Sequence, residues 1–444
     1  MLMPQVSLAK SPPLGVPMRF LVTAPLFGIL AALLVLWAGP DGMGNRWMPA
    51  TLAVTHLLVL GVMGSAMLGA LLQVFPVVIG HPVHRSAVVS YLTHGLLTLG
   101  VTLLAYGLLQ GNDGVLLGAT TALALAVLIY ALAVVRTFFS VATWGDTGRA
   151  IALALAALGI TGGLGIWLTL GHTSMLPLAR QWTDLHLTWG LVGWFPLLLF
   201  GVAYQVVPMF QVTPNYPRIV QRWLAPGLFG LLLVVSWMML VGRQGADRLA
   251  IELLLATGLG SFALITLDLQ RRRRRRLKDV TVWYWRLAMG CLLLAIALWL
   301  SARLVAGISL DPRYPMMLGV LIVVGAAISV INGMLYKIVP FLVWLHLTNK
   351  ASEAALQGKT LANKVPNMKQ IIGGKRAKLQ FHAHTTALVL AVTGVAGVPL
   401  ALQGAALAFG VANVLLLRDI LGALGTYRRS APPGAGHDTK KAAS

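Results

Sequence analysis

The sequence predicts an all-α polytopic membrane protein with twelve transmembrane helices in three pseudo-threefold four-helix arcs. Of its 444 residues, 58% are apolar and only 10% are charged, whereas soluble domains carry about 25% charged residues. Apolar runs long enough for the ~20 residues of a helical membrane span recur along most of the chain. A sequence motif also returns three times. Composition, run length and repetition together exclude a soluble fold.

The apolar runs divide into three sets of four, one set for each arc. The first arc is expected over residues 18–138, the second over 149–270 and the third over 280–422. The spans themselves are expected at 18–38, 50–80, 86–108, 114–138, 149–170, 184–211, 220–242, 246–269, 281–306, 314–346, 383–400 and 402–422.

A motif ending in proline supports this division, because it recurs at a constant spacing of 132 residues. It ends at Pro76, Pro208 and Pro340, and two sets of glycines and one polar set keep the same phase. These sets are Gly61, Gly193 and Gly325, then Gly69, Gly201 and Gly333, and then Gln73, Gln205 and Lys337. Small glycines let neighbouring helices approach closely. Three copies of a four-span unit indicate a ring of related segments, with any bound group lying between them.

The distribution of lysine and arginine predicts the topology. If residues 1–17 form a cytoplasmic segment, the outward loops hold only six of the 34 basic residues, namely Arg46, Arg180, Arg243, Arg248, Arg303 and Arg313. The positive-inside rule then places both termini in the cytoplasm, with a lysine-rich insertion at 347–381 and a disordered polar tail at 430–444. We expect a multi-pass protein of a bacterial inner (cytoplasmic) membrane. Its net charge of +22 is a topology and anionic-lipid signal, and nucleic-acid binding is not expected.

Two histidines are expected at similar depth near the outer face. His56 precedes Pro76 by 20 residues and His186 precedes Pro208 by 22, which places them ~3 Å apart in depth. The offset of two residues turns a helix by roughly 200°, so the rings on related helices would face each other between arcs. Neutral imidazole is a ligand of haem iron and of copper. The pair therefore predicts a haem or copper site, unless each histidine only hydrogen-bonds a neighbouring helix.

A second set of histidines is expected toward the cytoplasmic side. Its members lie at or near the ends of the predicted spans and are His81, His84, His94, His346, His382 and His384. If the arcs close into a ring, these imidazoles would gather around a copper or zinc ion, with His94 and His384 deepest in the bundle. The alternative is that they lie among lipid headgroups and bind nothing.

The repeated polar position, Gln73, Gln205 and Lys337, lies three residues before each motif proline. Proline leaves a backbone carbonyl one turn earlier without its donor, and these side chains could supply one. Alternatively, Lys337 with Tyr336 and Asn332, and with Gln73 and Gln205 of the same layer, would form a proton or anion path from the cytoplasm, because a desolvated lysine changes its protonation state readily.

The stretches around His56 and His186 resemble a known superfamily. The segment Thr55 to Gly64, followed by Gly69 and Phe75-Pro76, resembles the second helix of the haem-copper oxidase catalytic subunit, nitric oxide reductases included. By this resemblance His56 would ligate a low-spin haem. The second stretch resembles that superfamily's His-x-His helix, with Asp184 at the first histidine position; it comprises His186-Leu187, Gly190, Gly193-Trp194, Gly201, Tyr204 and Pro208.

Departures from that pattern limit the chemistry. The span 220–242 has no histidine for the oxidases' copper pair, 184–211 lacks their His-x3-Tyr element, and 314–346 has no His-x-His. An oxygen-reducing binuclear centre is therefore not expected. The chain more closely resembles divergent, non-oxidase relatives such as the NnrS family, twelve-helix bacterial proteins associated with haem, copper and nitric oxide, although it lacks that family's Trp-His-x-His-Glu-Met signature.

The resemblance implies one haem b, or copper, in respiratory electron transfer or in nitric oxide or metal handling, with a redox protein or quinone as partner. Internal repeats and proline-broken helices are also typical of a secondary transporter for a small ion or metal, although many transporters use inverted repeats and these run in one orientation. No soluble-enzyme motif occurs. The lone Cys291 excludes a disulfide within the chain and thiolate clusters.

Overall fold

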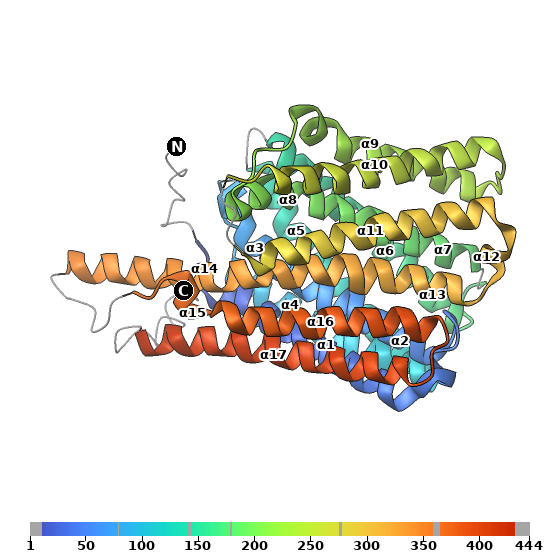
Figure 1. Cartoon of the computed structure of the whole chain (residues 1–444), viewed down its shortest axis with the longest axis horizontal. Coiled ribbons are helices and arrows are strands. Elements are labelled where there is room, and N and C mark those ends of the chain that lie inside the picture. The colour runs from blue at the N-terminus through green and yellow to red at the C-terminus, as the bar shows by residue number, and fades with distance from the viewer. Residues whose placement is uncertain are drawn as a thin grey trace.

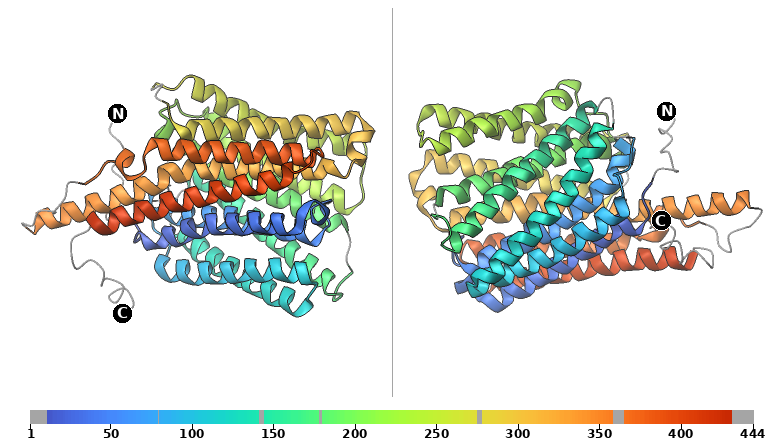
Figure 2. Two further views of the ribbon diagram at one scale, coloured as in Figure 1. Left: turned by 60° about the horizontal axis from the view of Figure 1, so that its bottom comes forward. Right: turned by 180° about the vertical axis from the view of Figure 1, so that it is seen from behind.

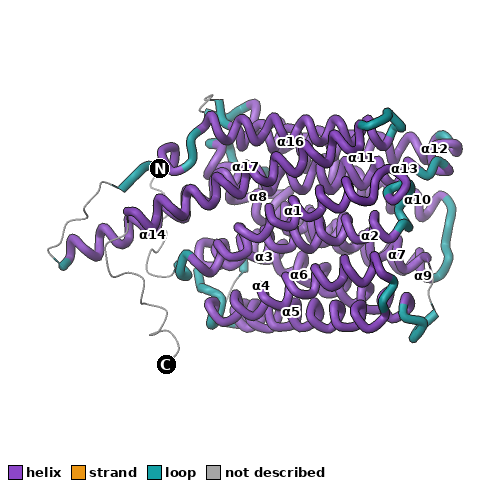
Figure 3. The backbone as a smooth tube through the Cα atoms, turned by 90° about the horizontal axis from the view of Figure 1, so that it is seen from below, coloured by secondary structure: helices purple, strands orange, loops and turns teal. Residues whose placement is uncertain are grey.

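The computed structural model describes residues 11–78, 80–140, 144–177, 180–274, 278–357 and 365–430. Within these ranges the chain is helical and contains no strand (Figures 1 and 3). Eleven of the described helices are long and apolar enough to cross a membrane. The predicted class, an all-α polytopic membrane protein, is confirmed.

The helices follow the same order in each arc. The first arc contains α1 (Gly15–Gly42), α2 (Pro49–His56), the π-helical segment η2 (Leu57–Gly64), α3 (Ser65–Val78), α4 (Ser86–Gln110) and α5 (Asp113–Phe139). The second contains α6 (Gly145–His172), α7 (Arg180–Thr188), the π-helical η3 (Trp189–Trp194), α8 (Phe195–Gln211), α9 (Arg218–Leu240) and α10 (Ala246–Arg271). The third contains α11 (Val280–Leu304), α12 (Ala306–Leu310), α13 (Arg313–Gly319), the π-helical η4 (Val320–Ile328), α14 (Ser329–Leu356), α15 (Met368–Ile371), α16 (Gly374–Val395) and α17 (Ala401–Ser430).

The second span of each arc lies at the centre of the bundle. In the most apolar window of these three spans, 67%, 72% and 72% of residues are buried, against 44% or less in the other candidate spans. Around them the arcs join in sequence, because α5 packs on α6, α10 on α11 and α17 on α1. The long helices run side by side along one axis (Figures 1 and 2). The outer helices thus present apolar surface to lipid and shield a core of three related spans.

A π-helical segment occurs at the same point of every second span. The segments η2, η3 and η4 begin at residues 57, 189 and 320, which is the period of the proline motif to within one residue. π-Helices are rare and frequently mark functional sites. Their recurrence shows that the repeat extends to a specific backbone conformation.

The repeated glycines are sites of close helix contact, as predicted. A Cβ atom at Gly61 would lie 2.5 Å from Phe27 Cγ, and one at Gly325 would lie 2.7 Å from Cys291 Sγ. Phe27 and Cys291 occupy equivalent positions in α1 and α11, two repeat lengths apart. The first span of each of these arcs therefore packs on its second span at the same point, and any side chain at the glycine would force them apart.

The insertion in the third arc is more helical than the sequence suggested. Helix α14 continues to Leu356 and extends beyond the other helices in Figure 1, while α16 begins at Gly374 instead of near residue 383. Lysine, arginine, glutamine and alanine are good helix formers, so both helices continue through polar sequence. Because its first turns are polar, α16 is not among the eleven apolar spans, although it packs against α17. Residues 358–364 and the tail from 431 lie outside the described residues.

Candidate metal centre

His56 and His186 lie together between the first and second arcs. His56 is the last residue of α2, directly before η2, and His186 lies in α7 shortly before η3. Their ring centres are 6.4 Å apart and their planes differ by 30°. The structure therefore brings together the two rings that the offset in the repeat predicted to face each other.

Hydrogen bonds fix which nitrogen of each ring carries the proton. His56 Nδ1 lies 2.8 Å from the carbonyl oxygen of Leu52, and His186 Nδ1 lies 3.0 Å from that of Thr161. A carbonyl oxygen only accepts, so Nδ1 donates in both rings and Nε2 keeps its lone pair. No hydrogen bond reaches either Nε2 from the described part of the chain. Metal-binding histidines commonly have this arrangement, with the second ring nitrogen donating to a carbonyl.

Helix α6 positions the His186 ring through two of its residues. Thr161 supplies the accepting carbonyl, and Gly165, one turn further on, leaves room for the ring. A Cβ atom at Gly165 would lie 3.2 Å from His186 Cε1, closer than van der Waals contact allows without a small movement. The first span of the second arc thus orients the histidine of its second span.

The spacing of the two rings fits a single metal ion. An imidazole nitrogen binds a metal at about 2.0 Å and lies about 1 Å from its ring centre, so two rings on opposite sides of one ion have centres about 6 Å apart. The observed separation of the ring centres, 6.4 Å, is close to that value. Among the residues that the structure describes, no three His, Cys, Asp or Glu side chains are grouped as metal ligands. The protein itself therefore offers two ligands, which suits copper or the axial positions of a haem iron.

Asp184, at the first position of the predicted His-x-His element, has a different partner. Its Oδ1 accepts from Arg46 Nη1 at 2.7 Å, and the side chains of Arg46 and Asp184 are 31% and 48% exposed. Arg46 lies in the loop before α2, so this ion pair joins the two arcs beside the histidine pair. A carboxylate at this position holds the helices together instead of supplying a third ligand.

The second set of histidines does not converge in the described structure, so the predicted six-imidazole site is not found. His81 and His84 are exposed after α3, and His382 lies inside α16 with its ring edge against Phe381. Both ring nitrogens of His346 already have a hydrogen-bond partner, because Nδ1 lies 2.9 Å from the carbonyl oxygen of Leu342 and Nε2 lies 3.1 Å from that of Pro12.

His94 and His384 lie within the bundle, as expected, but each is held by a hydroxyl group. His94 Nε2 lies 2.8 Å from Thr23 Oγ1. The buried His384 has Nε2 2.8 Å from Ser329 Oγ and Nδ1 3.5 Å from Asn332 Nδ2. These rings also contact Phe20 and Tyr284, which are equivalent residues of α1 and α11. They are therefore related packing positions in two arcs.

The polar residues before the prolines have unequal surroundings. Lys337 Nζ forms an ion pair with Asp279 at 2.7 Å, and Gln205 Nε2 lies 3.5 Å from Thr147 Oγ1. Thr147 and Asp279 are one repeat apart, and the equivalent residue of the first arc is Gly15, which has no side chain. The buried Gln73 accordingly has no hydrogen-bond partner among the described groups. Neither Lys337 nor Gln205 donates to a proline-freed carbonyl in these contacts, so that expectation is not met for them.

Two residues of the predicted ion path contact polar groups in the bundle. Asn332 lies beside His384, and the Tyr336 hydroxyl donates to Asp419 Oδ2 at 3.1 Å. Asp419 is buried in α17 and is also paired with Arg418 at 2.9 Å. Asp419 was not among the residues expected at a functional site. An acidic residue within the apolar run 402–422 is the signal that could have identified it, because carboxylates are rare inside membrane spans.

No protein-family model matches this chain, and no curated protein matches it at a significant level. The fold and the site together define an all-α polytopic membrane protein with a histidine pair between its first two arcs.

Proposed function

We propose that the protein holds one redox-active metal centre, a haem b iron or a single copper ion, between His56 Nε2 and His186 Nε2. The supporting observation is the pair of adjacent rings, with centres 6.4 Å apart, each with Nδ1 on a backbone carbonyl and Nε2 without a hydrogen bond among the described residues. Either metal would supply a one-electron carrier near one end of the bundle. In a bacterial inner membrane, such a centre would serve respiratory electron transfer or nitric oxide or metal handling.

The proposal explains why two imidazoles from different arcs lie side by side with the same ring nitrogen unpaired within the described part of the chain. Both residues are partly buried near one end of the bundle, and ionisable side chains in membrane spans are candidates for a functional site. Because the ligands come from different arcs, metal binding would also stabilise the contact between those arcs. In return, the carbonyls of Leu52 and Thr161 hold both rings in the tautomer that can bind.

The two metals differ in the space that they need. A copper ion needs only the gap between the rings, whereas a haem also needs a flat space for the porphyrin. The cavity near His56 is lined by Val54 and Leu58, each two residues from His56, so it lies on the opposite face of that helix. That cavity therefore would not hold a porphyrin bound to His56, and the visible spectrum distinguishes a haem from a bare copper ion.

A secondary transporter is the second candidate, supported by separate observations. Asp419 is buried within a span and accepts from Tyr336, and the half-buried Lys337 pairs with Asp279. Ionisable groups inside membrane spans commonly mark ion pathways. A transporter of this kind would need no bound metal at the histidine pair.

Metal analysis of the purified full-length protein tests the proposal. The protein would be produced in cells supplied with haem precursor and copper, and its metal content and visible spectrum would be measured. We expect about one equivalent of copper, or of iron with a Soret band and split visible bands after reduction. His56→Ala and His186→Ala should each lose that signal, and His382→Ala, outside the pair, should retain it.

Two results would contradict the metal proposal. One is a wild-type protein that is folded, colourless and free of metal under these conditions, which favours the transporter. The other is full retention of the metal signal in both His56→Ala and His186→Ala. Size-exclusion profiles would show that each variant is folded before its metal content is compared.

A further inference from the structure

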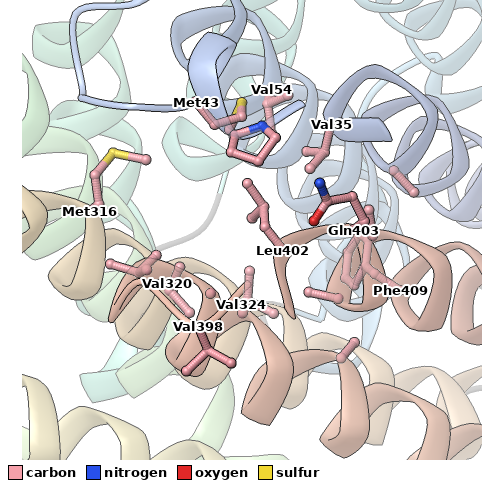
Figure 4. A pocket seen from close by; sticks show the side chains of 18 of the residues that line it. Val35, Met43, Val54, Met316, Val320, Val324, Val398, Leu402, Gln403 and Phe409 are labelled. Carbon is pink, nitrogen blue, oxygen red and sulfur yellow. The ribbon is translucent and has the colours of Figure 1, made fainter. Parts of the chain in front are cut away.

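The structure contains a cavity of about 330 Å³ between the first and third arcs. Its walls come from α1, α2, η2, α13, η4, α16 and α17 and from the loops after α1 and α16, and Figure 4 shows it from close by. It is separate from the histidine pair, because it lies on the other face of the helix that carries His56. Its volume is within the range of about 300–1,000 Å³ that is usual for small-ligand sites.

The walls of this cavity are apolar and adaptable. Val54, Met43, Met316 and Phe409 project toward it in Figure 4. Methionine side chains adjust to the shape of a ligand, and an aromatic ring offers a flat surface for stacking. A cavity with these walls favours a hydrophobic ligand that reaches it from the bilayer.

One polar side chain, Gln403 of α17, enters this apolar space (Figure 4). Its Oε1 is buried and has no hydrogen-bond partner among the groups that the structure describes. An unpaired buried amide oxygen costs about 1–3 kcal/mol. This position therefore favours a ligand with a polar group that bonds the amide, and a hydrocarbon chain alone would leave the amide unsatisfied.

Arg313 also borders the cavity, but its charge is already neutralised. Its guanidinium Nη2 and Nε contact Asp311 at 2.7 and 3.0 Å, and Nη1 donates to the carbonyl of Ala396 at 3.3 Å. Hydrogen bonds from Arg313 hold the pKa of Asp311 below its usual value, so Asp311 stays ionised at neutral pH. The cavity thus favours a neutral polar group over a carboxylate or phosphate.

We propose that this cavity binds the head group of a membrane quinone, in both its quinone and its quinol forms. The amide of Gln403 can serve both forms, since Nε2 donates to a quinone carbonyl and Oε1 accepts from a quinol hydroxyl. The ring would lie among the apolar walls near Phe409, with the isoprenoid tail directed to lipid. This site does not depend on a metal being present at the histidine pair.

A binding experiment with matched ligands and variants tests this site. The full-length protein in phospholipid nanodiscs would be titrated with a ubiquinone analogue carrying a ten-carbon tail, and with decylbenzene, which has the ring and tail but no oxygens. We expect the quinone to bind at one site, at least tenfold more tightly than decylbenzene. Gln403→Leu should weaken quinone binding about tenfold, Ala391→Phe should fill the cavity and abolish it, and Gln205→Leu, at an exposed amide on α8, should leave it unchanged.

Equal affinity for the two ligands, or unchanged quinone affinity in folded Gln403→Leu, would overturn the proposal. A tightly held phospholipid that native mass spectrometry detects and that quinone does not displace would also overturn it. If Gln403→Leu does not fold, Gln403→Met and Ala391→Phe provide the same test. Binding is measured both on the wild-type protein and on His56→Ala, which the proposed function expects to be metal-free, so the result does not depend on the metal centre.

Discussion

Two pairs of histidines lie inside this bundle, and their surroundings differ in one decisive respect. His56 and His186, on second spans, have Nδ1 on backbone carbonyls and Nε2 without a hydrogen bond. His94 and His384, on third spans, instead have Nε2 bonded to the hydroxyls of Thr23 and Ser329. The first pair is arranged to bind something further, whereas the second pair is engaged in packing contacts.

This difference shows why depth alone is a weak guide to function in a membrane bundle. His56 and His186 were expected near the outer face between two arcs, and His94 and His384 were expected within the bundle; the structure places all four rings between helices. The two pairs differ in which ring nitrogen forms a hydrogen bond and in whether its partner is a backbone carbonyl or a side-chain hydroxyl. A carbonyl fixes the tautomer and leaves a ligand atom, while a hydroxyl can adapt as donor or acceptor and occupies that atom.

The largest effect is expected from His384→Ala. This substitution removes the partner of Ser329 Oγ and leaves a cavity beside Tyr284, so we expect a loss of roughly 2–4 kcal/mol in the free energy of unfolding. Metal content should not change in the folded fraction. Unfolding of the detergent-solubilised protein, followed by circular dichroism, measures the first quantity, and mass spectrometry of metals measures the second.

His56→Ala is the counterpart, and it should show the opposite pattern. The metal-free protein should lose less than about 1 kcal/mol, because only one hydrogen bond to Leu52 disappears, while the metal is lost completely. If His384→Ala removed the metal and His56→Ala did not, the assignment of the two pairs would be reversed.

Gly165→Ala tests whether the close contact between α6 and the His186 ring matters for metal binding, because it leaves both proposed ligand residues unchanged. The new methyl group would press on His186 Cε1 and displace its ring by a few tenths of an ångström. We expect about tenfold weaker metal binding, equivalent to about 1.4 kcal/mol, with little change in folding. Gly163→Ala is the control, because a Cβ atom there meets nothing within 4 Å. Equal metal affinity in the two variants would show that metal binding does not require the space that Gly165 leaves for the His186 ring.

Composition and apolar run length predicted the all-α membrane class, although eleven rather than twelve of the described helices are long and apolar enough to cross a membrane. The repeat predicted that the rings of His56 and His186 lie together. This prediction succeeded because residues at equivalent positions of related helices lie at the same depth in the membrane and point in the same direction around the helix axis. The same reasoning failed for His81, His84 and His382, whose distances across the ring depend on helix packing that no spacing reveals. It also did not anticipate that Gln73 would lack a partner, since this depends on the glycine at position 15 of another helix.

The smallest effect is expected from the ion pair beside the ligand pair. Arg46 and Asp184 join the arcs at 2.7 Å, but their side chains are 31% and 48% exposed. Exposed pairs contribute about 0.2–1 kcal/mol and weaken with salt, so Arg46→Ala should lower metal affinity only about two- to fivefold. The wild-type affinity should approach that of the variant as salt concentration rises. A loss in Arg46→Ala as large as in His186→Ala, and independent of salt, would mean that Arg46 has a direct part in holding the bound group, beyond joining the two arcs.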